Sequence, residues 1–188
     1  MASELIVQTL KGPTSGANAN KVIIPSGQTL ELNEGVALPS GTTLPAGVGG
    51  KVLQVVQNTT SGATYTTSTS FVNTNLSASI TPSSTSSKVL ISFNMQVIAP
   101  VNTRAIITVM RGNVSFGVDL GTSNGAGVGN TFTSSGENAG TIAATILDSP
   151  STTSSQTYTV AVRNDAGGYV YAPDFGSLAH IVLQEIAG

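Results

Sequence analysis

The sequence predicts an all-β protein in which a short repeated segment precedes an antiparallel β-sandwich or jelly roll. After residue 50, apolar and polar residues alternate with a period of two in several segments, as in strands with one buried face. Clusters rich in Ser, Thr and Gly separate these segments, and helical periodicity is hard to find. Only 9% of the residues are charged, against about 25% in ordinary soluble domains. Such a low charge favours self-association, although a monomeric sandwich of unusual Ser and Thr content is the alternative.

A repeat occupies residues 24–50. The sequence of Ile24–Leu30 recurs at Leu38–Leu44 and, truncated, at Leu44–Gly47. Each copy is a short strand followed by a turn in which Pro presets φ and Gly supplies a positive φ. One chain would leave the apolar residues of the repeat in water, whereas several chains wound about one axis would bury them, which predicts the shaft of a homo-oligomeric fibre. The residues expected to pack in this shaft are Ile24, Leu30, Leu32, Leu38 and Leu44.

About nine strands are expected after the shaft. The most regular alternation lies within Lys88–Ala99 and predicts a long, half-buried strand. Residues 105–110 are apolar on both faces, which predicts one face on the core and the other on a neighbouring subunit. The turn at 164–168 predicts a hairpin between the strands on either side of it. The expected strands are Lys51–Gln57, Leu76–Ile80, Lys88–Ala99, Arg104–Arg111, Val114–Leu120, Thr141–Leu147, Gln156–Arg163, Tyr169–Tyr171 and Leu178–Ile186.

Composition argues against several classes of protein. The net charge is −2 and the sequence has no cluster of Lys and Arg, which argues against a nucleic-acid groove. Without cysteine the fold has neither disulfides nor a thiolate metal site. The first residues lack the cationic region of a signal peptide, and no apolar run approaches the roughly 20 residues of a membrane helix. We therefore expect a soluble chain, made without Sec export and not inserted in a membrane.

One pattern resembles catalytic machinery. Gly121–Gly125 matches the G-x-S-x-G elbow of hydrolases around Ser123, and Asp148 or Asp174 and then His180 follow in the order of a catalytic triad. The elbow requires a strand that runs into a helix, and nothing after residue 125 is helical, so we expect a surface loop. The lone histidine is expected to be a packed side chain, although three copies on a symmetry axis would suffice for a metal. The sequence therefore predicts no enzyme, metal site or cofactor.

Binding is the more plausible activity of the C-terminal part. Tyr169 and Tyr171 lie beside the Gly167-Gly168 pair, where an aromatic face with a hydroxyl edge suits a sugar or a protein side chain. Arg104 is a further candidate. The alternatives are that one tyrosine lies in the core and the other in a subunit interface, and that the arginine is an ordinary solvated side chain.

The N-terminal apolar run is predicted to bind another protein. Its residues suit a strand or peptide that adds to a partner, and the polar stretch at 12–20 is typical of a linker. The alternative is a terminal strand folded onto its own shaft. The residues expected to anchor the chain are Leu5, Ile6, Val7 and Leu10.

Short segments in a characteristic order connect the chain with a family. They are Ser87–Ile91, Met110–Gly112, Ile146–Pro150, Thr157–Val160 and Ile181–Ile186. This series resembles the C-terminal head of tail-fibre-like virion proteins of marine bacteriophages of the cyanophage or pelagiphage type. Ser3–Pro13 is similar to the N-terminal segment of the same group.

The resemblance implies a homotrimeric virion appendage in three parts. These are an attachment segment and linker at 1–23, an intertwined shaft at 24–50, and a jelly-roll head at 51–188 similar to the tumour-necrosis-factor and complement trimers. Its partners would be its own copies, another virion protein at the N-terminus, and a host-surface glycan or protein at the head; its location would be the virion, after synthesis in the host cytoplasm. The alternatives are a capsid decoration or tail connector protein without a receptor role, and a cellular trimeric jelly-roll lectin.

Overall fold

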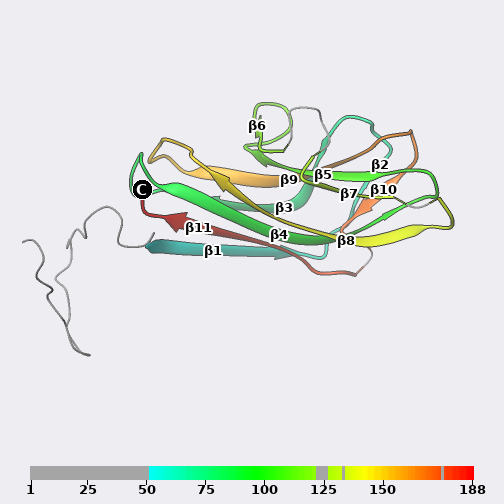
Figure 1. Ribbon diagram of the computed structural model, residues 1–188, viewed down its shortest axis with the longest axis horizontal. Helices are drawn as coiled ribbons and strands as arrows, with labels where there is room; N and C mark the ends of the chain where they lie inside the picture. The colour runs from blue at the N-terminus through cyan, green and yellow to red at the C-terminus, as the bar shows by residue number, and fades with distance from the viewer. Residues whose placement is uncertain (1–50, 122–126, 133, 175) are drawn as a thin grey trace, which may run out of the picture. The chain divides into compact units, whose positions relative to one another are not determined.

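Two antiparallel sheets pack face to face as a β-sandwich (Figure 1). The structure is a computed structural model and describes residues 51–121, 127–132, 134–174 and 176–188. The residues predicted to anchor the chain and to form the shaft all precede residue 51, so those predictions lie outside the described residues. Within the described part of the chain, no helix is long and apolar enough to cross a membrane.

The first sheet has six strands, and β4 is at its centre. On one side β4 pairs with β11 and, further along, with β10; on the other side it pairs with β8 over its whole length. β1 then pairs with β11, and β2 with β10, so that β1 and β2 form the far edge. The strands are β1 (Val52–Thr60), β2 (Thr64–Thr66), β4 (Lys88–Ala99), β8 (Asn138–Asp148), β10 (Val170–Ala172) and β11 (Ala179–Ile186).

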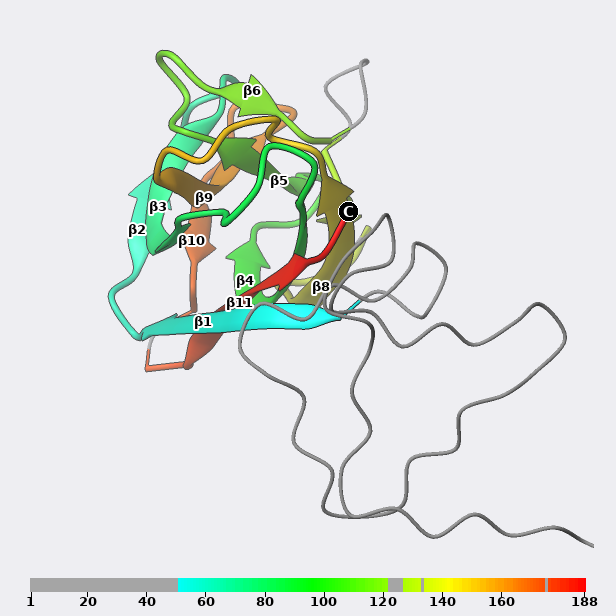
Figure 2. The same cartoon turned by 90° about the vertical axis from the view of Figure 1, so that its left-hand side faces the viewer.

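The second sheet has five strands in the order β3-β9-β5-β6, and β7 pairs with β5 beside β6. Figure 2 shows β1 beside β11 in one layer and β3 beside β9 in the other. Every second residue of a strand therefore faces the opposite sheet. The strands are β3 (Val72–Ile80), β5 (Ala105–Arg111), β6 (Val118–Asp119), β7 (Gly129–Thr131) and β9 (Gln156–Asn164).

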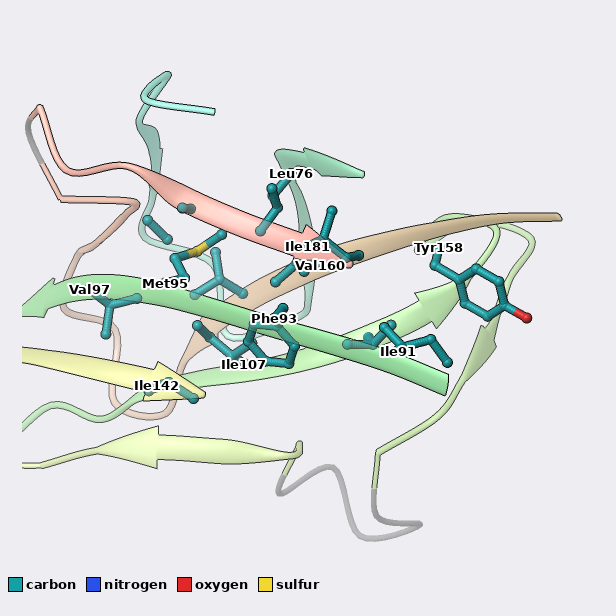
Figure 3. Close-up of a cluster of buried hydrophobic side chains, with 14 of the residues drawn as sticks. Leu76, Ile91, Phe93, Met95, Val97, Ile107, Ile142, Tyr158, Val160 and Ile181 are labelled. Carbon is teal, nitrogen blue, oxygen red and sulfur yellow. The ribbon is translucent and has the colours of Figure 1, made fainter. Parts of the chain in front are cut away.

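The core lies between the two sheets and follows the alternation predicted for β4. Val89, Ile91, Phe93, Met95 and Val97 are buried, while the residues between them face outward. Figure 3 shows four of them, Ile91, Phe93, Met95 and Val97, beside side chains of both sheets. Their partners in the figure are Leu76 of β3, Ile107 of β5, Ile142 of β8, Tyr158 and Val160 of β9, and Ile181 of β11.

β5 is buried on both faces, but its outward face does not need a neighbouring subunit to cover it. Ile106, Thr108 and Met110 are at most 7% exposed within the single chain. The covering residues come from the segment that follows β6: an added Cβ on Gly127 would lie 2.9 Å from Cγ2 of Ile106, and one on Gly121 would lie 2.5 Å from Oγ1 of Thr108. The prediction that this face packs on another subunit is therefore wrong, because the chain folds back over its own strand.

The predicted hairpin around residues 164–168 is also wrong. β9 belongs to the five-stranded sheet, whereas β10 pairs with β2 and β4 in the other sheet. The buried Asn164 side chain organises this crossing: its amide donates to the carbonyl oxygens of Ser68 and Gly168, and its Oδ1 accepts from the N–H of Gly167. Gly167 has a φ of 76°, a conformation that favours glycine.

Two short strands escaped the sequence analysis, and one predicted strand is mostly a turn. β2 and β7 lie in segments that were expected to be loops. In the predicted strand Val114–Leu120, only β6 is extended, because Oδ1 of Asn113 accepts hydrogen bonds from the N–H groups of Ser115 and Phe116 and folds the chain into a turn. The other predicted strands are present, with ends that differ by a few residues.

The sandwich has two distinct ends. At the proximal end Lys88 pairs with Ile186, which pairs with Val52, and the N–H of Ala187 donates to the carbonyl of Lys51 at 2.9 Å. At the distal end Ile98 pairs with a residue of β10. By the rise of an extended strand, Ile98 lies roughly 35 Å along β4 from Lys88. Residue 51 and the end of β11 thus lie together at the proximal end, beside the C-terminus marked in Figure 1.

Candidate functional site

Three tyrosines meet at the distal end of the six-stranded sheet. Tyr65 of β2 and Tyr171 of β10 are paired across the strands, and their ring centroids lie 5.0 Å apart. Tyr169, just before β10, lies 5.5 Å from Tyr171 and 6.3 Å from Tyr65. All three spacings are those of rings in contact. Tyr65 is 56% exposed, so the cluster presents aromatic surface to solvent on the outward side of the sheet.

A carboxylate adjoins this tyrosine cluster. The hydroxyl of Tyr169 donates a hydrogen bond to Glu137, which lies in the loop between β7 and β8. This hydrogen bond raises the pKa of Tyr169, because the neutral hydroxyl is the form that donates to the carboxylate. The bond also connects the tyrosines with a loop from the other edge of the sandwich.

Arg104 lies at the same end and has two partners. Its backbone N–H donates to Oδ1 of Asp165 at 2.7 Å, and its Nε lies 3.8 Å from Oδ2 of the same carboxylate. Its guanidinium also lies over the ring of Phe132, 5.2 Å from the ring centroid. Phe132 is 51% exposed. The arginine predicted as a binding residue thus contacts an acid and an aromatic ring at the surface.

Gly168 allows the distal loops to approach one another. A Cβ at this position would lie 2.5 Å from Oγ1 of Thr103 and 2.9 Å from Cγ of Pro100, so any larger residue would push the two loops apart. The loop before β10 therefore packs directly on the loop after β4. This contact brings the sequence-predicted residues Arg104, Tyr169 and Tyr171 to one end of the sandwich.

The outward face of the six-stranded sheet is nearly free of charge. Among the described outward residues of β1, β4, β8 and β11, the ionisable side chains are Lys88 and His180. Val55 on the edge strand β1 and Leu147 on the opposite edge strand β8 are aligned across the sheet, and their side chains are 56% and 54% exposed. A groove of about 390 Å³ crosses the middle of this face. It is lined by Ser92, Phe93, Asn94, Ala143, Ala144, Thr145, His180 and Val182.

The structure separates Asp148 from His180, two residues of the triad-like pattern. Asp148 is buried on the inward side of β8, where it accepts hydrogen bonds from Nη1 of Arg111 at 3.0 Å and from the hydroxyl of Tyr158 at 2.8 Å. His180 is on the outward side of β11, so the two side chains lie on opposite faces of the sheet. Ser123 lies outside the described residues. Among the residues that the structure describes, no group of three or more acidic or histidine side chains is suited to hold a metal.

Sequence reasoning found Tyr169, Tyr171 and Arg104 but missed three of their neighbours. Tyr65 lies in a segment rich in Ser, Thr and Gly that was expected to be a loop; its one signal was the Thr-Tyr-Thr triplet, whose residue types favour strands. Glu137 and Phe132 had no local signal, because their roles depend on loops that meet only in the folded chain. Comparison of the chain with models of protein families finds no family that matches, and comparison with curated proteins finds no relative.

Proposed function

We propose that this chain is a homotrimeric fibre or spike protein of a phage particle, anchored through its N-terminus, with a C-terminal head that binds a glycan or protein of the host surface. One observation carries the binding role. Tyr169, Tyr171 and Arg104, chosen from the sequence as receptor-binding candidates, gather at the distal end, whereas the chain enters the sandwich at the proximal end. The distal end is thus the end of the sandwich opposite residue 51. The phage assignment rests on the sequence resemblance.

The strand order supports a jelly roll. β1 with β2, β6 with β7, and β10 with β11 each occupy one line of their sheet, as interrupted strands do. Joining each pair leaves eight strands, four in each sheet, and the chain crosses between the sheets at most of its connections. Eight strands in two such sheets are the architecture of jelly-roll heads.

The outward face of the six-stranded sheet supports self-association of the heads. A protein surface without charge is poorly protected against contact with its copies, and apolar side chains such as Val55 and Leu147 lose water when they are covered. The corresponding face of β5 in the other sheet is already covered by its own chain. We therefore assign the trimer contact to the part of this face formed by β1, β4, β8 and β11, which leaves the tyrosines at the distal end uncovered. Three linked heads would also raise the avidity of weak sites.

Adsorption of particles to host cells tests this function. Particles whose copy of the chain lacks residues 51–188 are expected to lose adsorption, and the purified full-length protein is expected to block adsorption of intact particles. Normal adsorption of the truncated particles would contradict the receptor role. Together with labelling of the protein on the capsid surface, that result would favour the capsid decoration or tail connector role.

A further inference from the structure

We propose that the distal tyrosine cluster, formed by Tyr65, Tyr169 and Tyr171 with Glu137 beside it, binds a neutral sugar. The ligand class follows from the spacing of the rings, from their exposure and from the charge beside them. The proposal deepens the host-binding role stated above and rests on it only for its biological setting, since sugar binding is measured on the purified protein.

The ring spacing argues for a platform and against a cage. A cation held between two facing rings lies over each of them within about 6 Å of the centroid, so the two faces must stand further apart than rings in contact. Tyr65 and Tyr169, the near-parallel pair, have centroids 6.3 Å apart, which leaves no room for an ammonium group between their faces. Tyr171 is tilted against both rings and contacts them, with centroids 5.0 and 5.5 Å away. A ligand must therefore lie on the rings. Tyr65, at 56% exposure, offers the largest free surface.

A sugar ring fits such a platform. The C–H face of a sugar covers an aromatic ring, and its hydroxyls extend sideways to polar groups at the rim. Glu137 supplies such a group. A carboxylate has about four acceptor sites, and the hydroxyl of Tyr169 uses one of them, so others are left to accept hydrogen bonds from sugar hydroxyls.

The charges at this end favour a neutral sugar over an acidic one. The carboxylate of Glu137 would repel the carboxylate of a sialic or uronic acid at short range. Arg104, the cation of the neighbouring loop, already contacts Asp165 and the ring of Phe132. An acidic sugar would thus meet a negative charge on the platform, with the nearby positive charge engaged by an acid.

Tyrosine fluorescence gives a direct measurement. The chain has no tryptophan and four tyrosines, and three of them form the cluster, while the fourth, Tyr158, is fully buried. We expect titration of the full-length protein with chitotriose, mannotriose or maltotriose to change this emission saturably for at least one of the three sugars. The affinity for 3′-sialyllactose, measured in the same way, is expected to be at least tenfold lower than that for the neutral sugar that binds.

Matched variants locate the site. Tyr65→Ala is expected to weaken binding about tenfold through loss of the stacking ring, whereas Tyr65→Phe keeps the ring and most of the affinity. Glu137→Gln removes the repulsion between the two carboxylates and is expected to reduce the difference in affinity between neutral and sialylated sugars. Phe116→Ala, which removes a ring that is 94% exposed on another loop, is the control and should leave binding unchanged.

Three results would overturn the proposal. They are the absence of saturable binding of any neutral sugar at tens of millimolar, full affinity of Tyr65→Ala, and a lower native mass of folded Tyr65→Ala, which would show that the rings pack between copies. The two proposals fail separately. Particles that depend on residues 51–188 while the protein binds no sugar would contradict only the sugar site; sugar binding with unchanged adsorption of truncated particles would contradict only the host-binding role.

Discussion

At the scale of single residues, Glu185 shows how a charge is held inside this sandwich. It is 1% exposed on the inward side of β11. Its carboxylate accepts hydrogen bonds from the N–H and hydroxyl of Ser83, at 2.7 and 2.6 Å, and from Nε2 of Gln54 at 2.7 Å. These bonds connect the last strand with β1 and with the turn between β3 and β4. A buried carboxylate therefore has a structural role at the proximal end.

The protonation of Glu185 is expected to control stability in acid. Burial by itself raises its pKa, but the hydrogen bonds from Ser83 and Gln54 outweigh burial and lower the pKa to about 2 from an ordinary 4.5. Because the folded pKa is the lower one, this contribution is complete above about pH 4.5 and disappears as the pH falls towards 2. Urea denaturation at pH 7 and pH 3 should show wild type losing more stability than Glu185→Gln. The exposed Glu137→Gln variant is the control and should behave as wild type; an equal acid loss in Glu185→Gln would contradict the assignment.

At the scale of elements, one buried polar group connects the two sheets. Asp148 ends β8 in the six-stranded sheet, while Arg111 and Tyr158, which both bond to it, belong to β5 and β9 of the other sheet. The same arrangement raises the pKa of Tyr158, chiefly through burial and then through its hydrogen bond to Asp148. The two layers are thus held at the proximal end by hydrogen bonds as well as by apolar packing.

Removal of each partner of Asp148 is expected to have a different cost. Arg111→Met leaves a buried carboxylate without its cation and should lower the free energy of unfolding by about 3 kcal/mol. Tyr158→Phe removes one hydrogen bond and should cost about 1 kcal/mol. Arg104→Met, which breaks an ion pair whose arginine side chain is 53% exposed, is the matched control and should cost less than about 1 kcal/mol. Equal effects of Arg111→Met and Arg104→Met in chemical denaturation would show that the buried pair has no special role.

At the scale of the whole molecule, charged side chains are unevenly distributed, and one face of the sandwich carries almost none of them. Charged side chains at the two ends of the sandwich form pairs such as Arg104 with Asp165 and Arg111 with Asp148. The outward face of the six-stranded sheet instead carries Ser, Thr, Asn and Gln with Val and Leu. This is the face that we assign to contact between copies of the head.

Native mass spectrometry checks that assignment. The full-length protein is expected to have about three times the 18.9 kDa mass of one chain. Leu147→Glu places a charge on the outward face at a side chain that is 54% exposed, and should shift the mass towards one chain because an unpaired charge is costly in an interface. Phe116→Glu, at a side chain that is 94% exposed on a loop of the other sheet, should leave the mass unchanged. A trimer unaffected by Leu147→Glu would move the contact elsewhere, and a monomeric wild type would contradict the trimer.

Several parts of the fold could be predicted because their signal is local. The alternation in Lys88–Ala99 predicted both the bounds of β4 and its buried face, since side chains of a strand point alternately to either side. Short strands such as β2 and β7 have too few residues to show a period, and they are extended because β10 and β5, respectively, pair with them. The hairpin prediction failed because the 164–168 turn gives no information about which sheet receives the next strand.

By itself the sequence determined the β class, the sparse charge, most strand positions and three of the residues that gather at the distal end. Only the tertiary structure decided how these parts combine. It placed β9 and β10 in different sheets, covered β5 with its own chain, and brought Tyr65 and Glu137 to Tyr169 and Tyr171. The physical reason is that periodicity records which side of a strand is buried, whereas strand partners and loop contacts are set by packing between residues far apart in the chain.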